Sequence, residues 1–297
     1  MSPAETSATS LGKHVRNIDR AVDELARRTR FTKYQLFLLC LFPLIILLGQ
    51  IMAYGSPDET VHNYFTAKGN LVNSLYVKKG WFWTLLAYSN LVYHKVRRGT
   101  VNRKLILTSV CRVIFITIGW FLFTQWCWGL PIMDRIFLLT GGKCVDVSGP
   151  NIPSKIKDLF LHTPLSERLL YHSGDISSAT CRSLKGTWSG GHDPSGHVFL
   201  LSLSASLLLH EFIHLYRSED DDIITLYLQH RLNNFQAASH HAIITIVFSL
   251  MALGMLLMTA IKYHSLVEQL AGLLVALIVI WASNQVSLFI FGYPEHR

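Results

Sequence analysis

Five long runs of apolar side chains constrain what this chain can fold into more than any other feature. They cover residues 34–54, 105–127, 198–213, 242–261 and 270–291. About 20 apolar residues cross the hydrocarbon core of a bilayer as a helix, so the runs predict an all-α, polytopic membrane protein. A shorter, aromatic run at residues 81–94 predicts a sixth membrane-spanning helix. The apolar stretch of residues 134–142 is too short to cross, and we expect it at the membrane interface.

Charged residues are placed for membrane topology. They make up 15% of the 297 residues, whereas a soluble domain has about 25%. Basic side chains cluster before the first run and again between residues 95 and 104, and such clusters are typical of the cytoplasmic side. The net charge of +8 therefore does not indicate nucleic acid. The polar and basic first 33 residues predict no cleavable signal peptide.

These features predict one membrane domain between two cytoplasmic ends. We expect a basic tail over residues 1–33, a six-span catalytic domain over 34–293 and a short tail over 294–297. Within the domain, we expect a lumenal loop over 128–197 and a cytoplasmic loop over 214–241. Cys144 and Cys181 share the first of these loops. If that loop is lumenal, the two thiols could form a disulfide.

Two histidines are predicted to emerge on one face of the membrane. His197 directly precedes the fourth predicted span and His264 precedes the sixth. Because the chain crosses the membrane twice between them, both imidazoles lie on the same side. With the basic clusters in the cytoplasm, that side is lumenal.

Both histidines also lie where a helix is predicted to begin. "DPSGH" places Ser195 and Gly196 before one apolar run, and "YHSLVEQLAG" places Ser265 three residues before Glu268. A helix N-terminus is a favourable site for phosphate. One histidine could attack phosphorus while the other protonates the leaving oxygen.

A purely structural interpretation of these positions remains open. Histidines are common at membrane interfaces, and the pattern from Ser265 to Glu268 is also a capping box. Glu268, four residues after His264, could orient the imidazole or only cap the helix, and the two roles are compatible.

The order and spacing of these motifs resemble a known family. "CRSLKGTW…DPSGHVFLL" followed by "KYHSLVEQLAGLL" is similar to the fat storage-inducing transmembrane proteins, which in turn resemble lipid phosphate phosphatases. The resemblance implies a lipid phosphatase-like helical bundle in the endoplasmic reticulum membrane. It implies that His264 is the nucleophile, that His197 protonates the leaving group, and that Glu268 stands where the phosphatases usually carry Asp.

The same resemblance implies a substrate and a role. The family cleaves the diphosphate of fatty acyl-CoA at the lumenal face, which gives acyl 4′-phosphopantetheine and adenosine 3′,5′-bisphosphate. This activity supports lipid-droplet formation and lipid homeostasis in the endoplasmic reticulum. We expect no metal and no cofactor, and we expect membrane lipids, including diacylglycerol and triacylglycerol, as further partners.

One departure leaves the neutralisation of phosphate open. Lipid phosphatases use a Lys-x6-Arg-Pro element for this purpose, and the sequence has no such element. Arg182, Lys185 and Lys262 are the nearby cations on the lumenal side, and nothing in the sequence chooses among them.

Other interpretations belong to different classes of protein. His210-Glu211-Phe212-Ile213-His214 matches the H-E-x-x-H pattern of zinc proteases, but lies about 20 Å along the helix from His197. Arg112, inside the third predicted span, is expected to extend to the cytoplasmic surface. The chain could also be a non-catalytic protein that binds diacylglycerol or triacylglycerol, or a broader lipid phosphate phosphatase.

Overall fold

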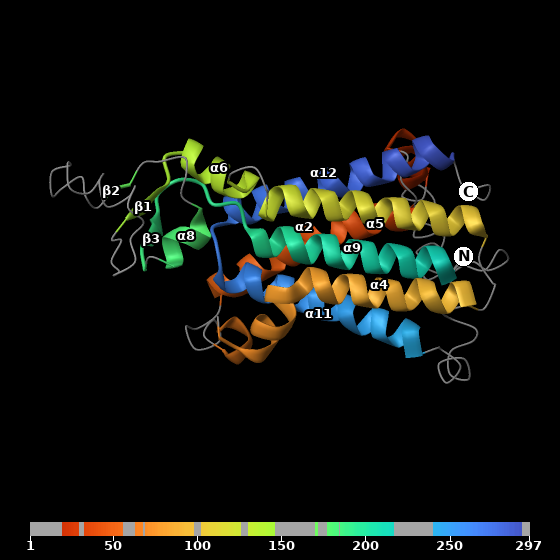
Figure 1. Cartoon of the computed structure of the whole chain (residues 1–297), viewed down its shortest axis with the longest axis horizontal. Helices are drawn as coiled ribbons and strands as arrows, with labels where there is room; N and C mark the ends of the chain where they lie inside the picture. Colours follow the sequence, from red (N-terminus) through yellow and green to blue (C-terminus); the bar gives the residue numbers. More distant parts are fainter. Residues whose placement is uncertain are drawn as a thin grey trace, which may run out of the picture.

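Long helices run side by side and form one bundle in the computed structural model (Figure 1). The structure describes residues 20–29, 33–55, 63–67, 69–97, 102–125, 130–145, 170–171, 177–183, 185–216 and 240–292. Within these residues the bundle consists of α2 (Lys33–Gly55), α4 (Gly80–Arg97), α5 (Arg103–Thr124), α9 (Gly196–Tyr216), α11 (His240–Lys262) and α12 (Leu266–Phe291). Residues 20–29 form a further short helix. Most of the predicted tails and of the predicted cytoplasmic loop lies outside the described residues.

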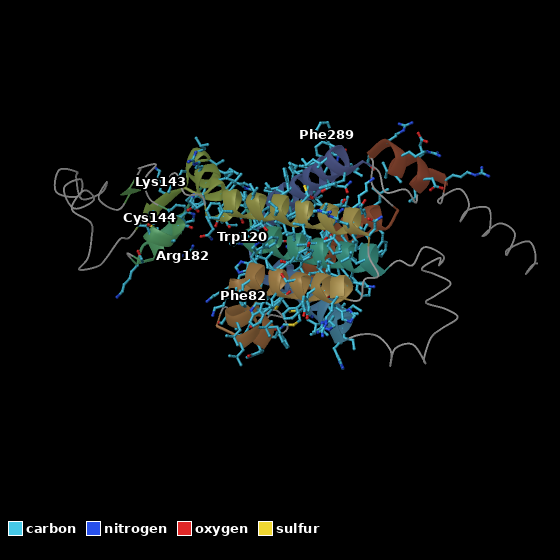
Figure 2. The ribbon with its side chains drawn as sticks, turned by 45° about the vertical axis from the view of Figure 1, so that its right-hand side comes forward. Phe82, Trp120, Lys143, Cys144, Arg182 and Phe289 are labelled. Atoms are coloured by element: carbon cyan, nitrogen blue, oxygen red, sulfur yellow. A yellow bond between two sulfur atoms is a disulfide. The ribbon has the colours of Figure 1, made fainter. Side chains whose placement is uncertain are left out.

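The helices confirm an all-α protein that passes the membrane several times. Five of them, α2, α5, α9, α11 and α12, are long and apolar enough to cross a bilayer. Apolar side chains on their outer surfaces are exposed, for example Phe289, which is 91% exposed near the end of α12 (Figure 2). Lipid would surround such side chains. α4 lies in the same bundle, and its crossing of the membrane stays a prediction.

α9 is the central helix of the bundle. Buried positions make up 67% of its apolar window, against 22–39% in the other four candidate spans. It packs against α11, α12, α4, α5 and α2. Small side chains let neighbours approach closely, as where the Ser204 hydroxyl accepts a hydrogen bond of 2.8 Å from Thr84 of α4. The helix that begins with the "SGH" motif is therefore held from all sides.

A small folded unit, here called the cap, covers one end of the bundle (Figure 1). It contains α6 (Ile132–Leu139), α8 (Ser178–Ser183) and strands β1 (Lys143–Val145), β2 (Leu170–Tyr171) and β3 (Thr187–Ser189). The strands form an antiparallel sheet in the order β2-β1-β3. The sequence did not predict this sheet.

A disulfide between Cys144 and Cys181 joins β1 to α8 within the cap. The Cα atoms of the two residues are 5.8 Å apart, and both side chains are buried. Phe137 of α6 stacks on Trp188 of β3, with ring centroids 4.2 Å apart. The cap is thus held by a covalent bond and an aromatic contact as well as by its short strands.

Arg112 does not extend to the cytoplasmic surface, so that prediction is wrong. Its guanidinium is buried and forms an ion pair with Glu211 of α9. A charge inside a membrane bundle is strongly stabilised by an opposite charge at contact distance. The ion pair with Glu211 of the central helix is therefore favoured over exposure of the Arg112 guanidinium at the membrane surface.

Candidate active site

The two helices that begin at the histidine motifs, α9 and α12, start next to each other. The Ser195 backbone N–H donates a hydrogen bond of 3.0 Å to the backbone oxygen of Glu268. His197 lies two residues after Ser195, and His264 lies four residues before Glu268. One hydrogen bond therefore connects the first turns of α9 and α12. His197 belongs to the first turn of α9, and His264 lies directly before the N-cap of α12.

Gly272 permits this close approach. A Cβ atom at this position would lie 2.4 Å from the backbone oxygen of Ser195, which is inside van der Waals contact. Because the clash would be with backbone, a side chain at this position could not simply rotate away. The glycine inside the apolar start of α12 is thus required by the contact between the two helices.

Ser195 caps α9. Its hydroxyl oxygen accepts a hydrogen bond of 3.3 Å from the Val198 backbone N–H, and the side chain is fully buried. An N-cap of this kind satisfies one of the unpaired donors of the first helical turn. Gly196 is the first residue of α9, and His197 follows it, half-buried.

The sequence left open whether Glu268 caps α12 or orients His264, and in the structure its carboxylate contacts both. Its Oε2 accepts a hydrogen bond of 2.8 Å from the Ser265 backbone N–H, and the Ser265 hydroxyl oxygen accepts one of 3.4 Å from the Glu268 backbone N–H, which forms a capping box. The Ser265 hydroxyl also donates a hydrogen bond of 3.0 Å to the same Oε2. The same Oε2 lies 3.6 Å from His264 Nδ1, and the two side chains are about one-fifth exposed, at 23% and 21%. This distance is too long for a hydrogen bond, so the carboxylate acts on the imidazole through its charge.

Asp193 is a further carboxyl group at this site. Its backbone N–H donates a hydrogen bond of 3.3 Å to Glu268 Oε1. Burial raises the pKa of the Asp193 carboxyl above its ordinary value. The charge of His264 acts against this shift, whereas Glu268 and the buried Asp134 of α6 add to it. Two carboxyl groups, those of Asp193 and Glu268, therefore interact electrostatically with the His264 imidazole.

The three candidate phosphate-binding cations lie on different elements. Arg182 belongs to α8 in the cap (Figure 2) and donates a hydrogen bond of 3.1 Å to the Ser178 hydroxyl. Its charge opposes the pKa shift of Asp193, which places it within electrostatic reach of the site. Lys185 occupies a turn between α8 and β3. Lys262 ends α11, two residues before His264.

The H-E-x-x-H motif lies towards the opposite end of α9 and is engaged in other contacts. Glu211 is ion-paired with Arg112, and His210 Nδ1 lies 3.0 Å from the Gln35 side-chain nitrogen. A general base must be free to accept a proton, which the ion pair opposes. Among the described residues, no group of three His, Cys, Asp or Glu side chains could hold a metal ion. The zinc protease interpretation has no support in this part of the chain.

Sequence reasoning missed two residues at the site. Asp193 directly precedes the "PSGH" motif, and a carboxylate so close to a proposed phosphate site was a usable signal. Gly272 stands inside an apolar run, where an isolated glycine indicates a close packing contact. Neither signal identifies the partner, because Ser195 and Gly272 are distant in sequence.

Comparison with known proteins places the chain among relatives of one kind. The model of the fat storage-inducing transmembrane protein family matches residues 61–283. Acyl-coenzyme A diphosphatase fit1 of Schizosaccharomyces pombe is 32% identical over 263 residues, which cover 87% of this chain and 85% of the relative. Acyl-coenzyme A diphosphatase SCS3 of Saccharomyces cerevisiae is 28% identical, over 58% of this chain and 63% of the relative.

A vertebrate relative extends the comparison. Acyl-coenzyme A diphosphatase FITM2 of Danio rerio is 25% identical, over 65% of each chain. No solved structure is significantly similar to the chain. The expected likeness of the bundle to the lipid phosphatase fold therefore stays a prediction.

Proposed function

Because the chain belongs to the fat storage-inducing transmembrane protein family, we propose that it hydrolyses the diphosphate bond of fatty acyl-CoA. The products are acyl 4′-phosphopantetheine and adenosine 3′,5′-bisphosphate. The relatives named acyl-coenzyme A diphosphatase support this activity, since one of them is 32% identical over most of both chains.

The observation that carries the proposal is the hydrogen bond between Ser195 N–H and the Glu268 backbone oxygen. It ties two helix beginnings into one site, and each brings a histidine from its own motif. Helix N-termini favour an anionic phosphate through their free N–H groups and dipoles. Binding of a neutral lipid alone would not require two imidazoles at an anion-binding site.

The geometry favours different tasks for the two histidines. The Glu268 carboxylate faces Nδ1 of His264, which leaves Nε2 to attack phosphorus. As the N–P bond forms, the bond from phosphorus to the bridging oxygen breaks, and protonated His197 donates its proton to that oxygen. Water then attacks the phosphorylated His264, His197 accepts a proton from this water, and the N–P bond breaks. Charge on Glu268 stabilises the imidazolium that forms at His264.

Two roles remain for the cap and the membrane. We assign Arg182 the first place among the candidate cations, because it lies on α8 of the cap and its charge acts on Asp193 beside the site. Lys185 and Lys262 are secondary candidates. The fatty acyl chain of the substrate would remain in the bilayer beside the exposed apolar faces of the helices. Diacylglycerol and triacylglycerol are candidate lipid partners, and lipid-droplet formation and lipid balance are the roles proposed for the activity.

We also propose that the site faces the lumen of the endoplasmic reticulum. The disulfide of the cap suits an oxidising compartment. The described basic residues of this region, Lys95, Arg97, Arg103 and Lys104, lie where α4 ends and α5 begins, at the end of the bundle away from the cap (Figure 1), as expected for the cytoplasmic side. This orientation requires α4 to cross the membrane and puts both termini in the cytoplasm.

Cysteine labelling in sealed microsomes tests this orientation. In a protein without the thiols of Cys40, Cys111 and Cys127, a membrane-impermeant maleimide should reach Arg97→Cys directly. Ser265→Cys and Ser189→Cys, at the site and in the cap, should react only after permeabilisation. Direct labelling of either one would contradict the lumenal placement.

Product analysis tests the proposed activity. The purified full-length protein in lipid vesicles should convert oleoyl-CoA into the two products named above, detected by mass spectrometry. The reaction should continue in EDTA, because imidazoles perform both steps. The proposal would be wrong if free fatty acid were released in place of acyl phosphopantetheine, or if the wild-type protein did not turn over oleoyl-CoA. Phosphatidate cleavage at a higher kcat/KM would favour a broader lipid phosphate phosphatase.

A further inference from the structure

The turn between α11 and α12 holds His264 in an unusual backbone conformation. Its φ angle is +65°, in the left-handed region that non-glycine residues rarely adopt. Such a conformation is strained and persists only where surrounding contacts impose it. The contacts that impose it therefore determine where the imidazole is presented.

Gln269 supplies the contacts on the inner side of this turn. Its side-chain nitrogen is 2.7 Å from the backbone oxygen of Tyr263, 3.2 Å from that of His264 and 3.3 Å from that of Ala260. The side chain is fully buried, with 0% exposure. These carbonyls belong to the end of α11 and the turn after it, where the regular helical donors are missing. One amide group thus binds the peptides on either side of the His264 Cα atom.

Gln50 provides a natural comparison. Its side-chain nitrogen donates a hydrogen bond of 2.8 Å to the same Ala260 oxygen, from the neighbouring helix α2. Unlike Gln269, within the part of the chain that the structure describes, it makes no hydrogen bond to the carbonyls of Tyr263 or His264. Both glutamines cap α11, whereas Gln269 in addition holds the turn that carries His264.

We infer that Gln269 is a positioning residue for the catalytic imidazole of His264. It does not touch the reacting atoms. By fixing the carbonyls on both sides of the turn, it keeps the backbone of His264 left-handed and its ring beside Glu268. This inference rests on the proposed function, because it assumes that His264 attacks the substrate.

The test compares Gln269→Met with Gln50→Met in the full-length protein, with oleoyl-CoA as substrate. Methionine keeps approximately the length of glutamine and removes the donors. We expect Gln269→Met to lower kcat at least about 10-fold with KM nearly unchanged, because small misplacements of a reacting group are costly. Gln50→Met should keep kcat within about 2-fold of wild type, although both variants lose a cap and have similar midpoints of thermal unfolding.

Gln269→Glu serves as the conservative variant. In this buried position we expect a protonated carboxyl group, which donates one hydrogen bond where the amide donates two. Its kcat should lie between those of wild type and Gln269→Met. If Gln269→Met does not accumulate as folded protein, Gln269→Glu decides the question by itself, and an unchanged kcat overturns the inference.

Equal losses of kcat in Gln269→Met and Gln50→Met would also overturn the inference, because the glutamine would then act only as a helix cap. Failure of the proposed function looks different. In that case wild-type protein does not hydrolyse oleoyl-CoA, or His264→Ala is as active as wild type, before any comparison between the glutamines is made.

Discussion

Replacement of His264 by alanine is expected to abolish acyl-CoA hydrolysis, with a loss of kcat of at least about 1,000-fold. The nucleophile forms the covalent bond to phosphorus, so its removal cannot be compensated by a better leaving group. His197→Ala should lower turnover of oleoyl-CoA about 100- to 10,000-fold, the range typical of a lost general acid.

A change of substrate separates the two roles. An aryl phosphodiester, whose leaving group needs no proton, should be cleaved by His197→Ala at a rate much closer to that of wild type. The same substrate should not restore His264→Ala. Steady-state turnover of both substrates by the purified variants provides the measurement.

His240→Ala is the matched control for these variants. His240 is exposed at the first residue of α11, at the opposite end of that helix from His264, so its removal should leave turnover unchanged. Rescue of His264→Ala by the aryl substrate would mean that the two roles are reversed. Full activity of both variants would favour the non-catalytic lipid-binding protein.

Glu211→Ala is expected to destabilise the protein by about 3–5 kcal/mol, the usual effect of leaving one member of a buried ion pair without its partner. Glu211 is fully buried and Arg112 is 6% exposed, so the guanidinium charge would remain in the membrane interior. The measurement is thermal or denaturant-induced unfolding of the full-length protein in lipid bicelles.

The double variant Arg112→Met with Glu211→Met distinguishes the ion pair from simple loss of packing. Apolar side chains of similar size remove both charges together, so this protein should recover most of the lost stability. Arg103→Met, at the exposed start of α5, is the control and should change stability by less than about 0.5 kcal/mol. A double variant as unstable as Glu211→Ala would contradict the ion-pair explanation.

Much of the candidate site could be predicted because its two motifs are local. Ser195 with His197, and His264 with Ser265 and Glu268, each lie within a few residues of a helix start, and cap geometry depends mainly on such short spacings. The role of Glu268 could not be decided in this way. Whether a carboxylate caps a helix or faces a ring depends on atomic positions. In the structure the Glu268 carboxylate contacts both the Ser265 backbone N–H and the His264 ring.

The sequence by itself determined that the protein crosses the membrane several times as helices. Hydropathy is a local property, and a chain in lipid has few ways to satisfy its backbone hydrogen bonds. The number of predicted crossings between His197 and His264 was enough to expect them on one side.

Only the tertiary structure decided which side chains meet. It pairs Arg112 with Glu211, brings Gly272 against Ser195, places Gln269 beneath the His264 turn and folds the cap around a disulfide. In each case the partners come from separate elements or from a turn that no periodicity describes. Such contacts depend on how helices rotate and pack against one another, and that arrangement results from many weak interactions across the whole bundle.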